Sequence, residues 1–272
     1  MNRREFNKNV SLLSLAALAG VPACAVRKKK APTFLIVSGW QTVNIGDIAH
    51  TPGLLALIDR YVPDAEYYLW PKDIAGHGAE EMLRRNFPKL KILKTNLPGE
   101  PLPDLTDEVK QVFDQCDILL HGSGPHVLEI EKIQLWSSYT SKPYGVCGVT
   151  EQALYPELQE IIENSSFFFT RESASLQVVR QGVTNASKTG FFPDATFGLT
   201  LHDEKKSRDF LHQHGLGTRE FICVVPRLRY TPYYKIHDYV NWSEEKSRRS
   251  TPLMISTKRL TMKNYEPLSP YG

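Results

Sequence analysis

The sequence predicts an α/β fold, in which a doubly wound parallel sheet of Rossmann-like type carries helices on both faces. Short apolar runs alternate with stretches whose apolar residues recur at helical spacing, and polar or glycine-rich segments directly follow several of these runs. Alternating strands and helices form a parallel sheet, because each helix crosses back over the sheet to the next strand. Such sheets bind ligands at the carboxyl ends of their strands, so the polar segments mark the expected site.

Each expected element is a short run bounded by turn residues. The expected strands cover residues 33–37, 65–70, 90–93, 116–120, 143–149, 166–170, 187–192 and 221–225. The expected helices cover residues 52–61, 79–86, 107–113, 154–164 and 173–181. These elements predict an N-terminal Rossmann-like domain over residues 31–203 and the start of a second one over residues 204–242.

The first 30 residues differ from the rest of the chain in charge. They hold seven basic residues and one acidic residue, a net charge of +6, so the whole chain's +3 leaves −3 for residues 31–272. We expect no nucleic-acid partner, because this mildly acidic body carries no basic footprint. No apolar run reaches the roughly 20 residues that span a bilayer, so no stable membrane span is expected.

The N-terminal segment, residues 1–30, has the order of an export signal. Arg3 and Arg4 precede a short apolar run, and small residues around Ala25 follow it. The Arg-Arg-x-Phe spacing resembles the twin-arginine signal. We therefore expect the twin-arginine translocase to export the chain to the periplasm, with cleavage after Ala25. The alternatives are a chance pair of arginines and a lipoprotein anchor at Cys24.

The remaining cysteines, Cys116, Cys147 and Cys223, contain no C-x-x-C pair. Neither a disulfide framework nor a zinc site is therefore indicated. A reduced protein suits the twin-arginine route, which exports chains that have already folded.

The first two candidate segments contain glycines after expected strands. Asn44, Gly46 and Asp47 follow the first strand, where the N–H groups of the next helix could bind an anion. The alternative is a plain turn whose polar side chains bond their own backbone.

The second segment runs from His121 to His126. Gly122 and Gly124 would let a ligand approach the backbone, and the two histidines could hold a phosphate or act as an acid. The alternative is a loop that needs glycine for its conformation.

Charged residues follow later strands. Arg171 ends one strand and could clamp a carboxylate or phosphate, the alternative being a surface ion pair with Glu172 or Glu151. Asp194 lies inside an apolar segment, as a helix cap or as a functional acid. Arg227 follows the last expected strand, at the site or on a solvated edge.

The order of these segments resembles the polysaccharide pyruvyl transferase family over roughly residues 34–229. Its most specific parts are Arg-Glu-Ser at 171–173 and Asp-Ala-Thr-Phe at 194–197, after an Asn-x-Gly-Asp turn at 44–47. The resemblance implies two Rossmann-like domains facing a cleft, similar to the glycosyltransferase-B class.

The resemblance also implies the chemistry: a pyruvyl group passes from phosphoenolpyruvate to two hydroxyls of one sugar or polysaccharide and forms a cyclic ketal. No metal or organic cofactor is implied. The resemblance places Asn44, Gly46 and Asp47 near the sugar, Arg171 and Asp194 on the inner wall, and Arg227 near the donor. Chemistry alone names His121 and His126 as candidates for the general acid.

Two other functions remain open. One is an exported carbohydrate-binding protein that kept the cleft but lost catalysis. This alternative arises because phosphoenolpyruvate is made in the cytoplasm, where members of the family usually work. The other is a glycosyltransferase with a nucleotide-sugar donor, which the absence of a G-x-G-x-x-G motif after the first strand disfavours.

Residues 243–272 form an expected irregular tail, with three prolines and neither helical nor strand periodicity. The strand expected at 221–225 would then have an unpaired edge. We therefore expect an incomplete second domain, a chain that is inactive through truncation, and proteolysis first after Trp242.

The leader generates a testable prediction. A fusion of residues 1–30 to a reporter that must fold before export should reach the periplasm, and the double change Arg3→Lys and Arg4→Lys should block it. Reporter activity in periplasmic fractions measures this. Equal export of both fusions would contradict the twin-arginine assignment.

Overall fold

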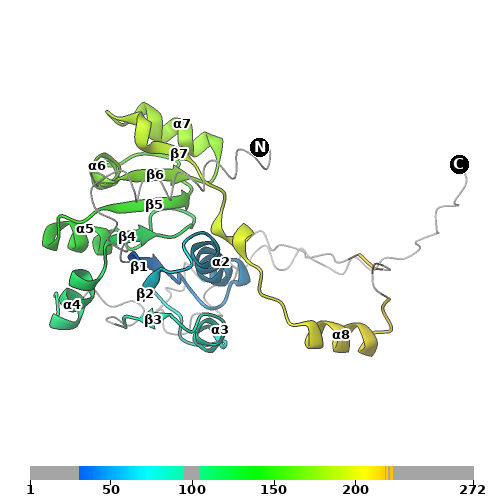
Figure 1. Cartoon of the computed structure of the whole chain (residues 1–272). Helices are drawn as coiled ribbons and strands as arrows, with labels where there is room; N and C mark the ends of the chain where they lie inside the picture. Colours follow the sequence, from blue (N-terminus) through cyan, green and yellow to red (C-terminus); the bar gives the residue numbers. More distant parts are fainter. Residues whose placement is uncertain (1–30, 95–104, 218, 220, 223–272) are drawn as a thin grey trace, which may run out of the picture. The chain divides into compact units, whose positions relative to one another are not determined.

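The computed structural model describes residues 31–94, 105–217, 219, 221 and 222 (Figure 1). The chain divides into two compact units between His202 and Asp203. The first unit contains a seven-stranded sheet, and the described part of the second contains helix α8 (Glu204–Gln213). Within these ranges, no helix is long and apolar enough to cross a membrane.

The sheet confirms the predicted α/β class. All strands run parallel, in the order β3-β2-β1-β4-β5-β6-β7. The strands are β1 (Thr33–Ser38), β2 (Glu66–Pro71), β3 (Lys91–Ile92), β4 (Ile118–His121), β5 (Tyr144–Val149), β6 (Phe167–Thr170) and β7 (Thr189–Phe191). The winding direction reverses between β1 and β4, so the carboxyl ends of these strands form the switch point at which such sheets bind ligands.

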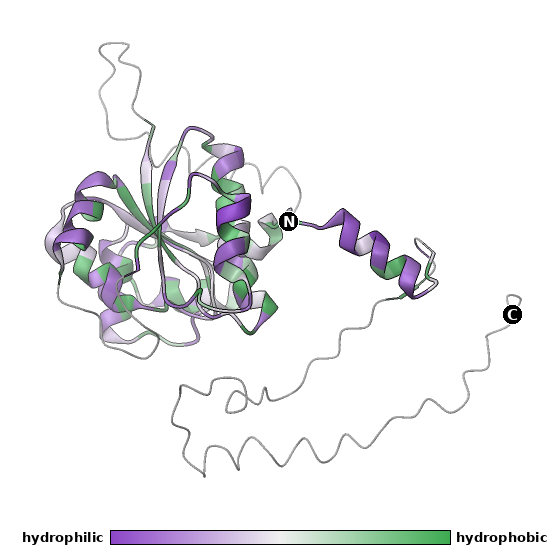
Figure 2. Ribbon diagram, turned by 90° about the horizontal axis from the view of Figure 1, so that it is seen from below, coloured by the Kyte–Doolittle hydropathy of each residue, from purple (hydrophilic) through white to green (hydrophobic). Residues whose placement is uncertain are grey.

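Helices cover both faces of the sheet (Figure 1). One core contains side chains of α2 (Ile45–Tyr61) and α3 (Ala79–Asn86). The other contains side chains of α4 (Asp107–Gln115), α5 (Ile130–Tyr139), α6 (Pro156–Asn164) and α7 (Ser173–Gln181). Figure 2 shows the hydrophobic sides of these helices turned toward the sheet. Strand β1 contributes side chains to both cores, which explains its continuous apolar run.

Helix α2 begins seven residues earlier than the expected start at Pro52. Asn44 adopts the extended backbone of an N-cap, and its side chain accepts a hydrogen bond from Gly46 N at 2.9 Å. This cap starts the helix, so Pro52 lies inside it, where the ring has no N–H to donate to Ile48 O. The expectation that proline opens the helix is therefore wrong, and the cap adds two turns that carry polar side chains.

Helix α5 is absent from the expected elements because its start lacks a sequence signal. Glu129 precedes it in a left-handed conformation, φ 54°, and provides no side-chain cap. Lys132 in the first turn is fully buried and donates to Pro71 O at 2.9 Å, so a charge occupies a core position. Helix α8 also lies outside the expected elements.

The other boundaries of the expected elements lie within two residues of the observed ones. The strand expected at 221–225 is the exception: Phe221 and Ile222 are not in a strand, and residues 223–225 lie outside the described ranges. The leader at 1–30 and the tail at 243–272 lie outside them as well.

Two glycines bring the last segment of the first unit against α2. The short 3-10 helix η2 (Ala195–Gly198) packs on α2, and a Cβ added at Gly53 would lie 2.1 Å from Ala195 O. A Cβ added at Gly198 would lie 2.6 Å from Gly53 O. The two backbones therefore approach as closely as they do only because neither position carries a side chain. This contact places Asp194, the N-cap of η2, beside α2.

Glu151 supports the loop that follows β4. Its Oε1 accepts a hydrogen bond from Val127 N at 2.7 Å, and its side chain is buried after β5. Burial raises the pKa of Glu151 to about 7, although the Val127 N–H favours the ionised form.

The glycine contact predicts that Gly53→Ala destabilises the first unit by about 1–3 kcal/mol, as overpacking does. An alanine in an open helix position would instead add up to about 1 kcal/mol of stability, so the sign of the change in unfolding free energy distinguishes the two cases. Gly46→Ala in the same helix is the control, because its Cβ would meet only the Asn44 side-chain oxygen, at 3.3 Å. Urea unfolding measures both, and a more stable Gly53→Ala chain would contradict the packing argument.

The raised pKa of Glu151 predicts a pH dependence. The unfolded chain releases this proton near pH 4 and the folded chain only near pH 7, so stability falls as pH rises through that window. The free energy of unfolding of Glu151→Gln, measured relative to the parent, should therefore be about 2 kcal/mol higher at pH 8 than at pH 5. Urea unfolding at the two pH values measures the difference. An equal effect at both would show that the carboxyl ionises freely in the folded protein.

Candidate active site

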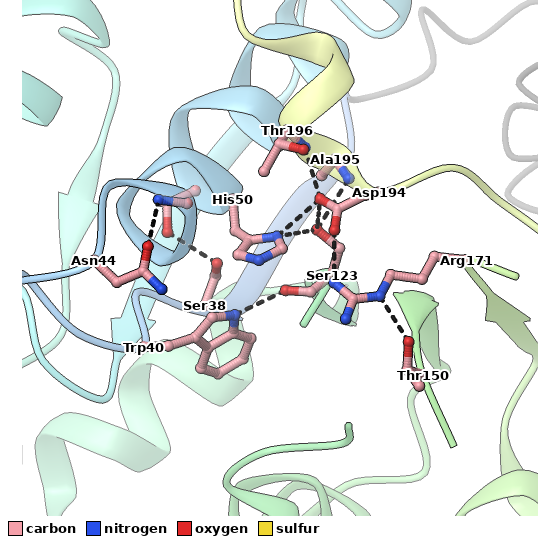
Figure 3. Close-up of polar contacts among 12 residues, drawn as sticks. Ser38, Trp40, Asn44, His50, Ser123, Thr150, Arg171, Asp194, Ala195 and Thr196 are labelled. Carbon is pink, nitrogen blue, oxygen red and sulfur yellow. Dashed lines mark hydrogen bonds and ion pairs between the residues drawn. The ribbon is translucent and has the colours of Figure 1, made fainter. Parts of the chain in front are cut away.

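Four segments at the carboxyl edge of the sheet converge on one group of polar side chains (Figure 3). We call the group the polar cluster; it consists of His50, Ser123, Arg171 and Asp194. They come from α2, from the loop after β4, from the end of β6 and from the segment after β7. The fold thus brings together Arg171 and Asp194, two of the predicted site residues.

Asp194 is the shared acceptor of the polar cluster. Its Oδ2 accepts from Arg171 Nη1 at 2.7 Å, and its Oδ1 lies 3.0 Å from His50 Nδ1. Oδ1 also accepts from Thr196 N at 2.9 Å, so Asp194 caps η2, as one of the two interpretations of the sequence held. Burial alone would raise the pKa of this carboxyl, but the hydrogen bonds from His50, Thr196 and Arg171 hold it well below its usual range. Asp194 is therefore a carboxylate.

Arg171 is oriented from two sides. Its Nε donates to Thr150 Oγ1 at 2.7 Å, while Nη1 contacts Asp194. The alternative interpretation, an ion pair with Glu172 or Glu151, does not hold: those carboxylates accept from Ser175 Oγ and Val127 N. The side chain is 27% exposed, and the two contacts leave three of the five guanidinium N–H donors for a ligand.

His50 and Ser123 are the members that sequence analysis did not single out. His50 Nδ1 lies 2.6 Å from Ser123 Oγ, which also accepts from Ala195 N at 3.0 Å. The available signal was spacing: Asp47 and His50 are three residues apart, so they share one face of a helix that begins at Ile45. A helix placed at 52–61 hides that spacing.

The turn before α2 is closed by its own side chains. Asn44 Oδ1 accepts from Gly46 N, which is the plain-turn interpretation, and Gln41 Nε2 donates to Asp47 Oδ2 at 2.5 Å. Burial raises the pKa of Asp47, with Asp194 adding to the shift, whereas a protonated His50, the hydrogen bond from Gln41 and the charge of Arg171 oppose it. Asp47 is therefore within electrostatic reach of the polar cluster and holds a proton more readily than Asp194.

The loop after β4 is packed rather than open. His121 is fully buried, stacks on Trp40 with ring centroids 5.1 Å apart, and its Nε2 lies 2.8 Å from Leu128 O. Burial lowers the pKa of His121 to about 4. A Cβ at Gly122 would lie 3.1 Å from Ser38 Oγ, and one at Gly124 would lie 3.2 Å from Trp40 Nε1. These glycines let β1 and its loop pack closely.

Two further candidates lie elsewhere. His126 is exposed, and partial burial together with the charge of Lys72 lowers its pKa. Arg227 lies outside the described residues. The part of the chain that the structure describes contains no group of three or more His, Cys, Asp or Glu side chains able to hold a metal ion.

The polar cluster combines an anchored guanidinium, an ionised carboxylate and an imidazole at the switch point of a doubly wound sheet. Comparison with curated proteins finds no match. The family model of polysaccharide pyruvyl transferases matches residues 44–265, which is most of the chain and includes every member of the polar cluster. The chain therefore belongs to the polysaccharide pyruvyl transferase family.

Proposed function

We propose that this protein transfers a pyruvyl group from phosphoenolpyruvate to two hydroxyls of a sugar and forms a cyclic ketal. The observation that supports it is Arg171, whose guanidinium is fixed by Thr150 and Asp194 at the switch point and keeps donors free. Membership in the family supplies the reaction class, and Arg171 supplies a cation suited to the donor's carboxylate or phosphate.

The donor needs two anion sites, because phosphoenolpyruvate carries a phosphate and a carboxylate. Arg171 binds one of them in bidentate fashion. The N-terminus of α2, which begins at Ile45 on the same edge of the sheet, binds the other through the first-turn N–H groups that Asn44 leaves uncapped. Arg227 remains the additional donor residue that the family resemblance implies.

The reaction needs an acid that protonates the methylene carbon of the donor. Asp47 suits this role, because burial raises the pKa of its carboxyl and a donor bound at Arg171 lies within its electrostatic reach. His121 is fully buried, so a substrate does not reach it in this conformation, and His126 has no hydrogen bond or ion pair with the polar cluster among the described residues. Asp194 then serves as the fixed negative charge between Arg171 and His50.

We also propose that the protein acts outside the cytoplasm, with a sugar of the cell envelope as acceptor. The twin-arginine route carries folded chains, so the sheet and the polar cluster would form before export. The support for this location is the leader sequence, in which Arg3 and Arg4 precede the apolar run.

Isothermal titration of the mature chain with phosphoenolpyruvate tests the proposal. Arg171→Ala should weaken binding about 30-fold, the scale of losing one partner of a desolvated charge pair. It should cost only about 1–2 kcal/mol of folding free energy, because Asp194 keeps its bonds to His50 and Thr196. Arg84→Ala is the control, since Arg84 pairs with Glu80 on the surface of α3.

Turnover is then followed as phosphate release in the presence of candidate glycans. Ketal formation by the parent chain is the result that this proposal predicts, and it would contradict the expectation, drawn from residues 243–272, that the chain is inactive. Binding of phosphoenolpyruvate without turnover, or of a glycan without phosphoenolpyruvate, would favour a carbohydrate-binding protein that has lost catalysis. Unchanged donor affinity in Arg171→Ala would show that Arg171 is purely structural.

A further inference from the structure

The contacts of His50 determine which of its ring nitrogens carries a proton. Nδ1 lies 3.0 Å from Asp194 Oδ1 and 2.6 Å from Ser123 Oγ. Asp194 is a carboxylate and can only accept, so a bare Nδ1 lone pair would face its oxygen and repel it. Nδ1 must therefore bear the hydrogen.

Ser123 is consistent with this assignment. Its Oγ already accepts from Ala195 N at 3.0 Å, and its own hydrogen can reach Asp194 Oδ1 at 3.4 Å. The second lone pair of Oγ is then free to accept from His50 Nδ1. The hydrogens on His50 Nδ1, Ser123 Oγ and Ala195 N thus all have acceptors when Nδ1 is the donor.

The other nitrogen, Nε2, is left for a ligand. Among the described residues, Nε2 has no hydrogen-bond partner. It differs from His121 Nδ1, which also lacks a partner but is fully buried. The side chain of His50 is only 5% exposed, and Nε2 retains access to solvent. A carboxylate behind one nitrogen and an open lone pair at the other is the arrangement of a histidine general base.

We infer that His50 is the general base of the proposed pyruvyl transfer and takes the proton of the attacking sugar hydroxyl on Nε2. This inference rests on the proposed function, because it assigns a role within that reaction. It adds a catalytic residue that lies outside the glycine-rich, arginine and aspartate segments on which the family resemblance depends.

The step balances as follows. Protonation of the donor's methylene carbon leaves its C2 cationic. The O–H bond of the hydroxyl breaks, its proton moves to Nε2, and the oxygen's electron pair forms the bond to C2. Asp194 stabilises the imidazolium without taking its proton. The imidazolium then gives the proton to the phosphate, which leaves with the electron pair of its bond to C2, so that C2 is cationic again. The oxygen of the second hydroxyl bonds to C2 and closes the ketal ring, and its proton returns to the carboxyl that protonated the methylene carbon.

The neighbouring carboxylates are poorer bases. Asp194 has a depressed pKa, and both of its oxygens already accept hydrogen bonds. Asp47 is bonded to Gln41 and has a raised pKa, which suits the donor of a proton rather than its first acceptor. His50 interacts with both carboxyls, and its Nε2 lone pair is uncommitted.

Two substitutions separate catalysis from positioning. In His50→Asn the amide nitrogen replaces Nδ1 and keeps the bond to Asp194, whereas Nε2 is lost. A general base therefore predicts that kcat falls by about 10²-fold or more, with the KM for phosphoenolpyruvate little changed. A residue that only positions Asp194 predicts near-normal kcat in His50→Asn, and that result would overturn the inference while the proposed function stands.

Controls accompany these kinetics. His77→Asn changes an exposed histidine outside the polar cluster and should leave kcat unchanged. His50→Gln places its amide near the position of Nε2 and loses the Asp194 contact, so its melting temperature should fall. An unchanged melting temperature in His50→Asn then shows that the Asn variant keeps this contact and is properly folded. Absence of ketal formation by the parent chain would remove both the proposed function and this role.

Chemical labelling gives a readout that needs no turnover. Diethyl pyrocarbonate acylates accessible neutral imidazole nitrogens, and peptide mass analysis locates the product. We expect labelling at His50, none at the fully buried His121, and slower labelling of His50 when phosphoenolpyruvate is bound. Labelling of exposed His77 with no labelling at His50 would overturn the assignment of an open Nε2.

Discussion

The close approach of η2 to α2 is the contact on which the polar cluster depends. Gly53 and Gly198 let the two backbones meet at distances that any side chain would prevent. Ala195 lies against Gly53, and the preceding residue, Asp194, contacts His50, which lies one helical turn before Gly53 in α2. Ala195 N then reaches Ser123 Oγ. Close packing of two backbone segments therefore determines the geometry of the polar cluster.

Charge balance explains why the polar cluster is stable while partly buried. Asp194 would be costly to bury alone, but it meets a guanidinium on one oxygen, and an imidazole and a backbone N–H on the other. The same neighbours push its pKa down, whereas Asp47, a short distance away, has its pKa pushed up. Two carboxyls with opposite shifts are the usual basis for separate acid and charge-stabilising roles at one site.

The sequence allowed most of the sheet to be predicted, because each buried parallel strand is a continuous apolar run. It also allowed Arg171 to be selected because it ends such a strand, and Asp194 because it is the one acidic residue in an apolar segment. His50 could not be selected, because the expected helix began at Pro52, and the Asn44 cap overrides the preference of proline for a first turn. His121 was selected for its chemistry, but tertiary packing against Trp40 seals it inside the protein.

The polar cluster joins parts of the chain that are synthesised far apart. Ser123 lies 73 residues from His50 and 72 from Ala195, so these contacts close long loops whose entropy must be overcome late in folding. A nascent chain that has emerged only through α7 already contains His50, Ser123 and Arg171, but it lacks Asp194, their common anion. Without that carboxylate, His50 and Ser123 can still bond each other, but nothing joins Arg171 to them. Assembly of the site thus coincides with completion of the whole sheet, and a partly synthesised chain lacks a formed site.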